Sequence, residues 1–328
     1  MKADRVLVGT FIAIIAIAAV AQEPVGPPQS IIKVPPPPPD PDAFRVSSEV
    51  ELVLLDVSVK DSEGGFVSGL KKSNFKVYEN KVEQNLTVFA AQDVPVTVGL
   101  VMDNSGSVRP KKPEIVTAAL TLVKNSNPRD EMFVVNFNDQ VNFGLPKTMP
   151  FTGDPAVLRQ ALMSHQARGR TALYDALKAG FDHLEEGRLD KKTLVLISDG
   201  GDNASNLSRD QIIQQAQLSL ATVYTVGVWD SGDRDRNPGF LRELSRITGG
   251  ESFVPDSMDQ LVGICGKIAQ DIRNRYTLGF VPSQSSDGKP RKLKVVATSE
   301  DGKKYEVRTR SQYLPAVHMS SSAGEGVK

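Results

Sequence analysis

The sequence predicts a doubly wound α/β domain, with a mostly parallel sheet and helices on both faces, together with a small antiparallel β-sandwich. Two observations carry this prediction. In the middle of the chain, short apolar runs alternate with stretches of helical periodicity, which is typical of a parallel sheet buried on both faces. Towards both ends, apolar and polar residues alternate with a period near two, as in strands that have one buried face.

The composition is that of an ordinary folded protein. Of the 328 residues, 40% are hydrophobic and 24% are charged, and this length allows about two domains. Since 39 Lys and Arg balance 39 Asp and Glu, the charge gives no case for a nucleic-acid partner or a polybasic membrane contact. A single cysteine, Cys265, and three histidines make a zinc cluster implausible.

Residues 1–21 have the pattern of a secretory signal peptide. Lys2 and Arg5 precede an apolar run, and a small-x-small motif that ends at Ala21 predicts cleavage after that residue. The run is shorter than the about 20 residues that a membrane-spanning helix needs, and no later segment is long enough. We therefore expect an exported protein, periplasmic or secreted, that has no integral membrane span after cleavage.

The segments outside the central region have different compositions. Residues 22–43 form a proline-rich linker, because their proline density disfavours helix and favours extended polyproline II. Residues 44–93 and 276–315 are β-rich, but each has too few strands for a core of its own, so we expect them to pair into one β-sandwich. We expect a disordered tail at 316–328. The strands expected in the sandwich cover 50–59, 75–79, 84–89, 276–281, 292–297 and 305–309.

Residues 94–275 are predicted to form the α/β domain. Its expected strands cover 96–102, 132–137, 193–197 and 222–228. Its expected helices lie near 111–126, 154–163, 172–186, 208–219, 237–248 and 257–274. In a sheet of this kind, ligands bind in the loops at the carboxyl ends of the strands.

Oxygen-bearing side chains occur in the loops at this edge. Asp103, Ser105 and Ser107 follow the first strand, Thr171 stands immediately before a helix, and Asp199 follows the third strand. Because these loops open at one edge, we expect the five side chains to converge. Carboxylate and hydroxyl oxygens suit Mg²⁺, Mn²⁺ or Ca²⁺ rather than zinc or copper. With only two carboxylates, the ion would stay electrophilic and keep a position for an incoming carboxylate.

The order and spacing of these residues resemble a known site. Asp103-x-Ser105-x-Ser107, Thr171 and then Asp199-Gly200 resemble the metal-ion-dependent adhesion site of von Willebrand factor type A domains. The resemblance implies that the three hydroxyls ligate the ion directly or nearly so, and that the two carboxylates bind it directly or through water. It also implies that ligand binding is linked to movement of the last helix. The whole arrangement of the chain resembles an exported bacterial group related to these domains.

The match departs from the family at Arg170, where a glycine is common. Arg168 and Arg170 either lie beside the ion, where they would attract an acidic ligand, or point to solvent. Asp202 and Asn203 either orient the second carboxylate or form a turn, and we favour the turn. The acidic stretch 230–236 is expected to be a solvated loop, because its arginines offset its carboxylates.

The function that this site implies is binding rather than catalysis. The resemblance predicts an exported, non-enzymatic module that captures a protein partner through an Asp or Glu carboxylate at the ion. An alternative is a structural or assembly component of the cell envelope, in which the metal only stabilises the loops. A phosphatase-like enzyme with Asp103 as nucleophile is disfavoured, since that chemistry usually needs a second Asp two residues later, where Ser105 stands.

Overall fold

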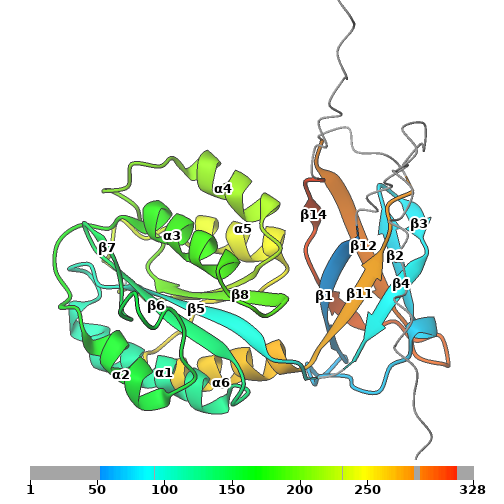
Figure 1. Ribbon diagram of the computed structural model, residues 1–328, viewed down its shortest axis with the longest axis horizontal. Coiled ribbons are helices and arrows are strands. Elements are labelled where there is room, and N and C mark those ends of the chain that lie inside the picture. The colour runs from blue at the N-terminus through cyan, green and yellow to red at the C-terminus, as the bar shows by residue number, and fades with distance from the viewer. Residues whose placement is uncertain (1–51, 92, 231, 284–288, 316–328) are drawn as a thin grey trace, which may run out of the picture. The chain divides into compact units, whose positions relative to one another are not determined.

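The part of the chain that the structure describes, in a computed structural model (Figure 1), is residues 52–91, 93–230, 232–283 and 289–315. These residues belong to one compact unit. The expected signal peptide at 1–21, the linker at 22–43, the first residues of the N-terminal β segment and the tail at 316–328 lie outside them. None of the helices in the described part has both the length and the apolar character needed to cross a bilayer.

A six-stranded sheet forms the centre of the α/β domain. Its strands are β5 (Val96–Asp103), β6 (Glu131–Phe137), β7 (Val141–Phe143), β8 (Lys191–Ser198), β9 (Thr222–Gly227) and β10 (Ser252–Phe253). They follow the order β10-β9-β8-β5-β6-β7, and all neighbours are parallel except β6 and β7. β5, β6 and β9 are buried along their whole length, as expected of strands that are covered on both faces.

Helices cover both faces of this sheet (Figure 1). They are α1 (Lys112–Asn125), α2 (Pro155–Met163), α3 (Leu173–Glu185), α4 (Arg209–Leu218), α5 (Pro238–Thr248) and α6 (Gln260–Arg273). α1, α2 and α6 lie on one face, and α3, α4 and α5 lie on the other. Local sequence sets several ends: the Asp154 side chain accepts from the Ala156 amide at 2.8 Å before α2, and Gly249, at φ 81°, ends α5. The predicted α/β fold class is confirmed.

Two four-stranded antiparallel sheets contain the remaining strands. These are β1 (Val53–Lys60), β2 (Phe75–Glu79), β3 (Val82–Gln84), β4 (Leu86–Ala90), β11 (Arg275–Phe280), β12 (Arg291–Ala297), β13 (Glu306–Arg308) and β14 (Gln312–Tyr313). The strand orders are β13-β1-β11-β4 and β14-β12-β2-β3. Leu55 and Val77 from the first part of the chain share one core with Leu278 and Ala297 from the last part. Strands from both parts of the chain therefore bury a common core.

One strand prediction is wrong. Residues 84–89 do not form a single strand, because the chain divides at Asn85 into β3 and β4, which belong to different sheets. Gln84 and Leu86 are both buried while Asn85 between them is exposed. The period-two alternation therefore continues through the corner, and the pattern does not reveal the change of sheet.

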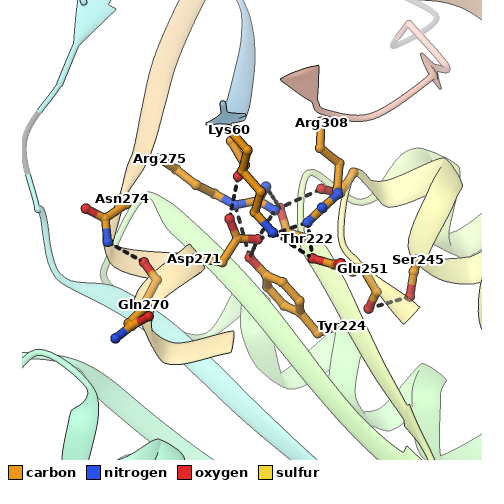
Figure 2. A network of polar contacts seen from close by, with 12 residues as sticks. Lys60, Thr222, Tyr224, Ser245, Glu251, Gln270, Asp271, Asn274, Arg275 and Arg308 are labelled. Carbon is orange, nitrogen blue, oxygen red and sulfur yellow. Dashed lines mark hydrogen bonds and ion pairs between the residues drawn. The ribbon is translucent and has the colours of Figure 1, made fainter. Parts of the chain in front are cut away.

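A buried polar network lies where α6 meets β11 (Figure 2). The Asp271 carboxylate accepts hydrogen bonds from Ser58 Oγ at 2.5 Å, Tyr224 Oη at 2.6 Å and Arg275 Nη2 at 3.1 Å. Asp271 is 1% exposed and Arg275 is 5% exposed. Burial opposes ionisation of Asp271, but the charge of Arg275 and the two hydroxyl hydrogen bonds outweigh it and lower its pKa. The network thus joins β1, β9, α6 and β11 through one carboxylate.

Ion pairs extend this network towards β13 (Figure 2). Glu251 Oε2 pairs with Lys60 Nζ at 3.3 Å and also with Arg308. Arg308 Nη1 lies 3.5 Å from Asp271 Oδ2. Since Lys60, Glu251 and Arg308 are partly exposed, we expect each outer pair to stabilise the fold less than the buried pair does.

Candidate metal site

The five residues that were predicted to hold a cation lie in three loops at the carboxyl edge of the central sheet. Asp103 is the last residue of β5, and Asp199 directly follows β8. Ser105 and Ser107 lie in the loop after β5, and Thr171 stands two residues before α3. The parallel pairing of β5 with β8 places the two carboxylates at neighbouring strand ends.

Side-chain hydrogen bonds join two of these loops. Ser105 Oγ lies 3.0 Å from Ser107 Oγ, and Ser107 Oγ donates to Asp199 Oδ2 at 2.8 Å. The Ser105 amide donates to Asp103 Oδ1 at 2.8 Å. Direct hydrogen bonds therefore link four of the five predicted ligands, and Thr171 is the fifth.

The negative charges of the Asp103 and Asp199 carboxylates repel each other. Asp103 is fully buried and accepts a hydrogen bond from Ser198 Oγ at 2.6 Å. Burial, and after it the charge of Asp199, raises the pKa of Asp103 to about 6. A site of this kind is stabilised by a positive charge, and its carboxylate and hydroxyl oxygens are the donors that hard divalent cations prefer. The residues present therefore fit a Mg²⁺-type ion.

The loop that carries Thr171 is held next to the serine loop. The Gly106 amide donates to the Gly169 carbonyl at 3.1 Å. Gly169 has φ 80°, a conformation that other residues rarely adopt, and a Cβ there would lie 2.1 Å from Asp139 Oδ2, so this turn strongly favours glycine. Asn203 Oδ1 accepts the Thr171 amide at 2.9 Å, and the Asn203 amide donates back to the Thr171 carbonyl at 3.0 Å. Asn203 thus positions Thr171 rather than Asp199.

Asp202, Arg168 and Arg170 make their contacts outside the set of predicted ligands. Asp202 Oδ1 accepts hydrogen bonds from Ser205 Oγ at 2.5 Å and from the Tyr174 amide at 3.3 Å, so it holds the start of α3. Arg170 Nε lies 3.6 Å from Asp139 Oδ1, and both side chains are exposed. Arg168 is also exposed, and its amide donates to the carbonyl of Asn104 at 2.8 Å. Both arginine side chains therefore stand outside the hydrogen-bonded set of carboxylates and hydroxyls.

The loop that follows β9 lies beside the candidate site, because the Asn237 amide at its end donates to the Asp199 carbonyl at 3.0 Å. The stretch 230–236 is expected to be a solvated loop, and its described residues are exposed except Asp233, which is partly buried. Burial and then the neighbouring charge of Asp199 raise the pKa of Asp233. The same loop is tied down by Lys111 Nζ, which donates to Asp230 Oδ2 at 2.7 Å. The arginines that were expected to neutralise the loop are exposed. The sequence position of this loop, directly after β9, predicts that it opens at the same sheet edge as Asp199.

The other reactive groups do not join this site. Cys265 is fully buried, so the expectation of a buried cysteine is confirmed, and burial raises the pKa of its thiol to about 12. His183 stacks against Phe151, with ring centroids 4.7 Å apart. Among the residues that the structure describes, no group of three or more His, Cys, Asp or Glu side chains is placed to hold a metal ion.

The part of the chain that carries the candidate site matches a known domain family. Residues 98–201 match the family model of the von Willebrand factor type A domain, so the chain contains such a domain, and all five predicted ligands lie within the matched range. The uncharacterized protein sll0103 of Synechocystis sp. is 28% identical over 148 residues, which cover 43% of this chain and 34% of that protein. The chain thus spans about a third of that relative's length.

Two solved structures resemble the chain in fold. A von Willebrand factor type A protein from Catenulispora acidiphila has a TM-score of 0.49 and 12% identity, covering 81% of this chain and 74% of that one. The vWF domain of the type V pili tip protein Mfa5 from Porphyromonas gingivalis has a TM-score of 0.45 and 16% identity, covering 56% of this chain and 96% of that one.

Proposed function

We propose that this protein is an exported, non-enzymatic module that captures a protein partner in a metal-dependent manner. The partner would contribute an Asp or Glu carboxylate, and Asp103, Ser105, Ser107, Thr171 and Asp199 would hold the divalent cation, Mg²⁺ or else Mn²⁺ or Ca²⁺. When bound, the cation supplies a positive charge that attracts and ligates a carboxylate. The observation that carries the proposal is the hydrogen-bonded series from Ser105 through Ser107 to Asp199 beside a buried second carboxylate.

The residues of this chain have distinct roles in the proposed capture. Asp103 and Asp199 provide the negative charge, and the hydroxyls provide neutral oxygens, so the loaded site is close to neutral and still attracts an anion. Hydrogen bonds from Ser198 and the Gly201 amide, at 2.6 and 2.9 Å, hold the two carboxylates in place. Pre-positioned ligands reduce the ordering needed when the ion and the partner bind.

Thermal unfolding tests the metal site. After chelation, adding Mg²⁺, Mn²⁺ or Ca²⁺ to the purified protein is expected to raise the unfolding midpoint. An ion at about 100 times its Kd stabilises by about 2.7 kcal/mol, which corresponds to a rise of roughly 5–10 °C for a domain of this size. Asp103→Asn should abolish the rise, whereas Asp210→Ala, which alters an exposed carboxylate in the first turn of α4, should leave it intact. A rise of equal size in Asp103→Asn would contradict the assignment.

Partner capture separates the proposal from the structural alternative. Immobilised protein is expected to retain a partner from an envelope extract with Mg²⁺, to release it on chelation, and to lose it in Asp103→Asn but not in Asp210→Ala. If the metal only stabilises loops, Asp103→Asn will lose the metal-induced thermal shift. Chelation will then leave retention of the partner unchanged, when measured at a temperature at which wild type and Asp103→Asn are both folded.

A further inference from the structure

A basic groove lies beside the candidate metal site, between α1 and α2. Its volume is about 710 Å³. Four positively charged side chains line it: Arg109, Lys112, Arg159 and Arg168. Among the described residues that line the groove there is no Asp or Glu.

The groove has an apolar surface as well as charge. Val116 and Leu120 of α1 and Met163 at the end of α2 contribute to its lining. Met163 is 59% exposed. The groove therefore offers apolar contact to a ligand in addition to positive charge.

The positive charges of the groove are largely uncompensated within the described chain. Arg109, Arg159 and Arg168 have no carboxylate oxygen within 4.0 Å among the residues that the structure describes, and their guanidinium groups stay charged. Arg109 Nε donates to the Ala167 carbonyl, at 2.8 Å. Like charges around one concavity repel each other, and an anion bound there removes that repulsion.

Two residues that line the groove, Lys112 and Arg168, contact the loop of the metal site. Asn104, which lies between two of the predicted ligands, accepts a hydrogen bond from Lys112 Nζ through its side chain. Its carbonyl accepts the Arg168 amide at 2.8 Å. Lys112 also lies close enough to Asp103 for the two charges to interact. The basic groove therefore borders the loop that carries three of the predicted ligands.

We propose that the groove between α1 and α2 binds an acidic protein segment that carries apolar side chains, and that the metal-binding carboxylate of the partner belongs to this segment. The inference rests on the proposed function, because it assumes that a partner carboxylate is captured at the cation. Arg109, Arg159 and Arg168 bind the flanking acidic side chains, while Val116 and Met163 contact the apolar ones.

Fluorescence anisotropy with a labelled peptide of alternating Asp and Leu tests this inference. The chain offers a matched pair of charge-reversed variants: Arg159→Glu with Arg168→Glu changes the groove, and Arg242→Glu with Arg246→Glu changes two exposed arginines of α5, on the opposite face of the sheet. The groove variant is expected to bind the peptide at least about tenfold more weakly than wild type, and the α5 variant within about twofold of it. A Lys–Leu peptide should not bind.

The outcomes separate this inference from the proposed function. Equal peptide affinity in the groove and α5 variants, no binding by wild type at millimolar peptide, or binding of anionic lipid vesicles instead of the peptide would each overturn the groove assignment. The groove variant should still show the metal-induced rise in unfolding midpoint. That result would show that its metal-site loops are intact. Peptide binding that depends on the groove but is unchanged by chelation would support the groove and contradict metal-dependent capture.

Discussion

Replacing Asp271 by alanine is expected to lower the free energy of unfolding by about 3–5 kcal/mol. The substitution leaves the Arg275 guanidinium, which is 5% exposed, without its buried counter-charge. The hydroxyls of Ser58 and Tyr224 lose their acceptor at the same time. Urea unfolding followed by circular dichroism measures the loss.

Two variants serve as controls for this prediction. Asp182→Ala removes an exposed ion pair with Lys178, at 2.6 Å on the surface of α3, and should cost no more than about 0.5 kcal/mol. Asp271→Asn keeps the size and one acceptor but not the charge, so its stability should lie between those of wild type and Asp271→Ala. If Asp271→Ala were as stable as Asp182→Ala, the network would not hold α6 and β11 together as described.

The pH dependence of this contribution has a definite sign. The pKa of Asp271 is lower in the folded protein than its ordinary value of 3.8, because the charge of Arg275 and the hydroxyl hydrogen bonds outweigh the burial that opposes ionisation. The folded state therefore binds fewer protons than the unfolded state in this range. The stability difference between wild type and Asp271→Asn should be constant above about pH 5 and should shrink as the pH falls below about 4.

Replacing Gly250 by alanine is expected to cost about 3 kcal/mol or more. An added Cβ would lie 1.9 Å from the carbonyl oxygen of Val223 and 2.6 Å from its carbonyl carbon. Both are backbone atoms of β9, which is held between β8 and β10, so neither can move without disturbing the sheet. Thermal or urea unfolding of the variant measures this effect.

Gly263 provides the matched control. It lies within α6, and a Cβ there would meet nothing within 4 Å. Gly263→Ala should therefore stabilise the protein by about 0.5–1 kcal/mol, through the higher helix propensity of alanine. Equal effects of the two substitutions would show that the close approach of Gly250 to β9 is not a constraint.

Much of the fold could be predicted because its signals are local. The apolar runs that became β5, β6, β8 and β9 are continuous, and such runs form strands that are buried on both faces. The corner at Asn85 could not be predicted in the same way, because Gln84 and Leu86 are both buried and continue the alternation of the strands on either side. The pattern records burial but not which of two sheets a strand joins.

The candidate site was predictable to a similar degree. Asp103, Ser105 and Ser107 share one short loop, so their spacing could be read directly. Asp233 reaches Asp199 only through the tertiary arrangement of two loops, and its own loop looks like an ordinary solvated turn. Asp271 and Arg275 are four residues apart, like many exposed helix pairs, and only the packed structure shows that both are buried.

The place of β1 in its sheet determines when the sandwich can be completed. β1 pairs only with β11 and β13 among the described strands, and 213 positions along the chain separate Ser58 from its partner Asp271. The α/β domain instead makes all its described strand pairings within residues 96–253. As the chain emerges during synthesis, the α/β domain has all its strands while β1 still has no partner. During this interval β1 presents unpaired backbone N–H and C=O groups, which can pair with another chain and lead to aggregation.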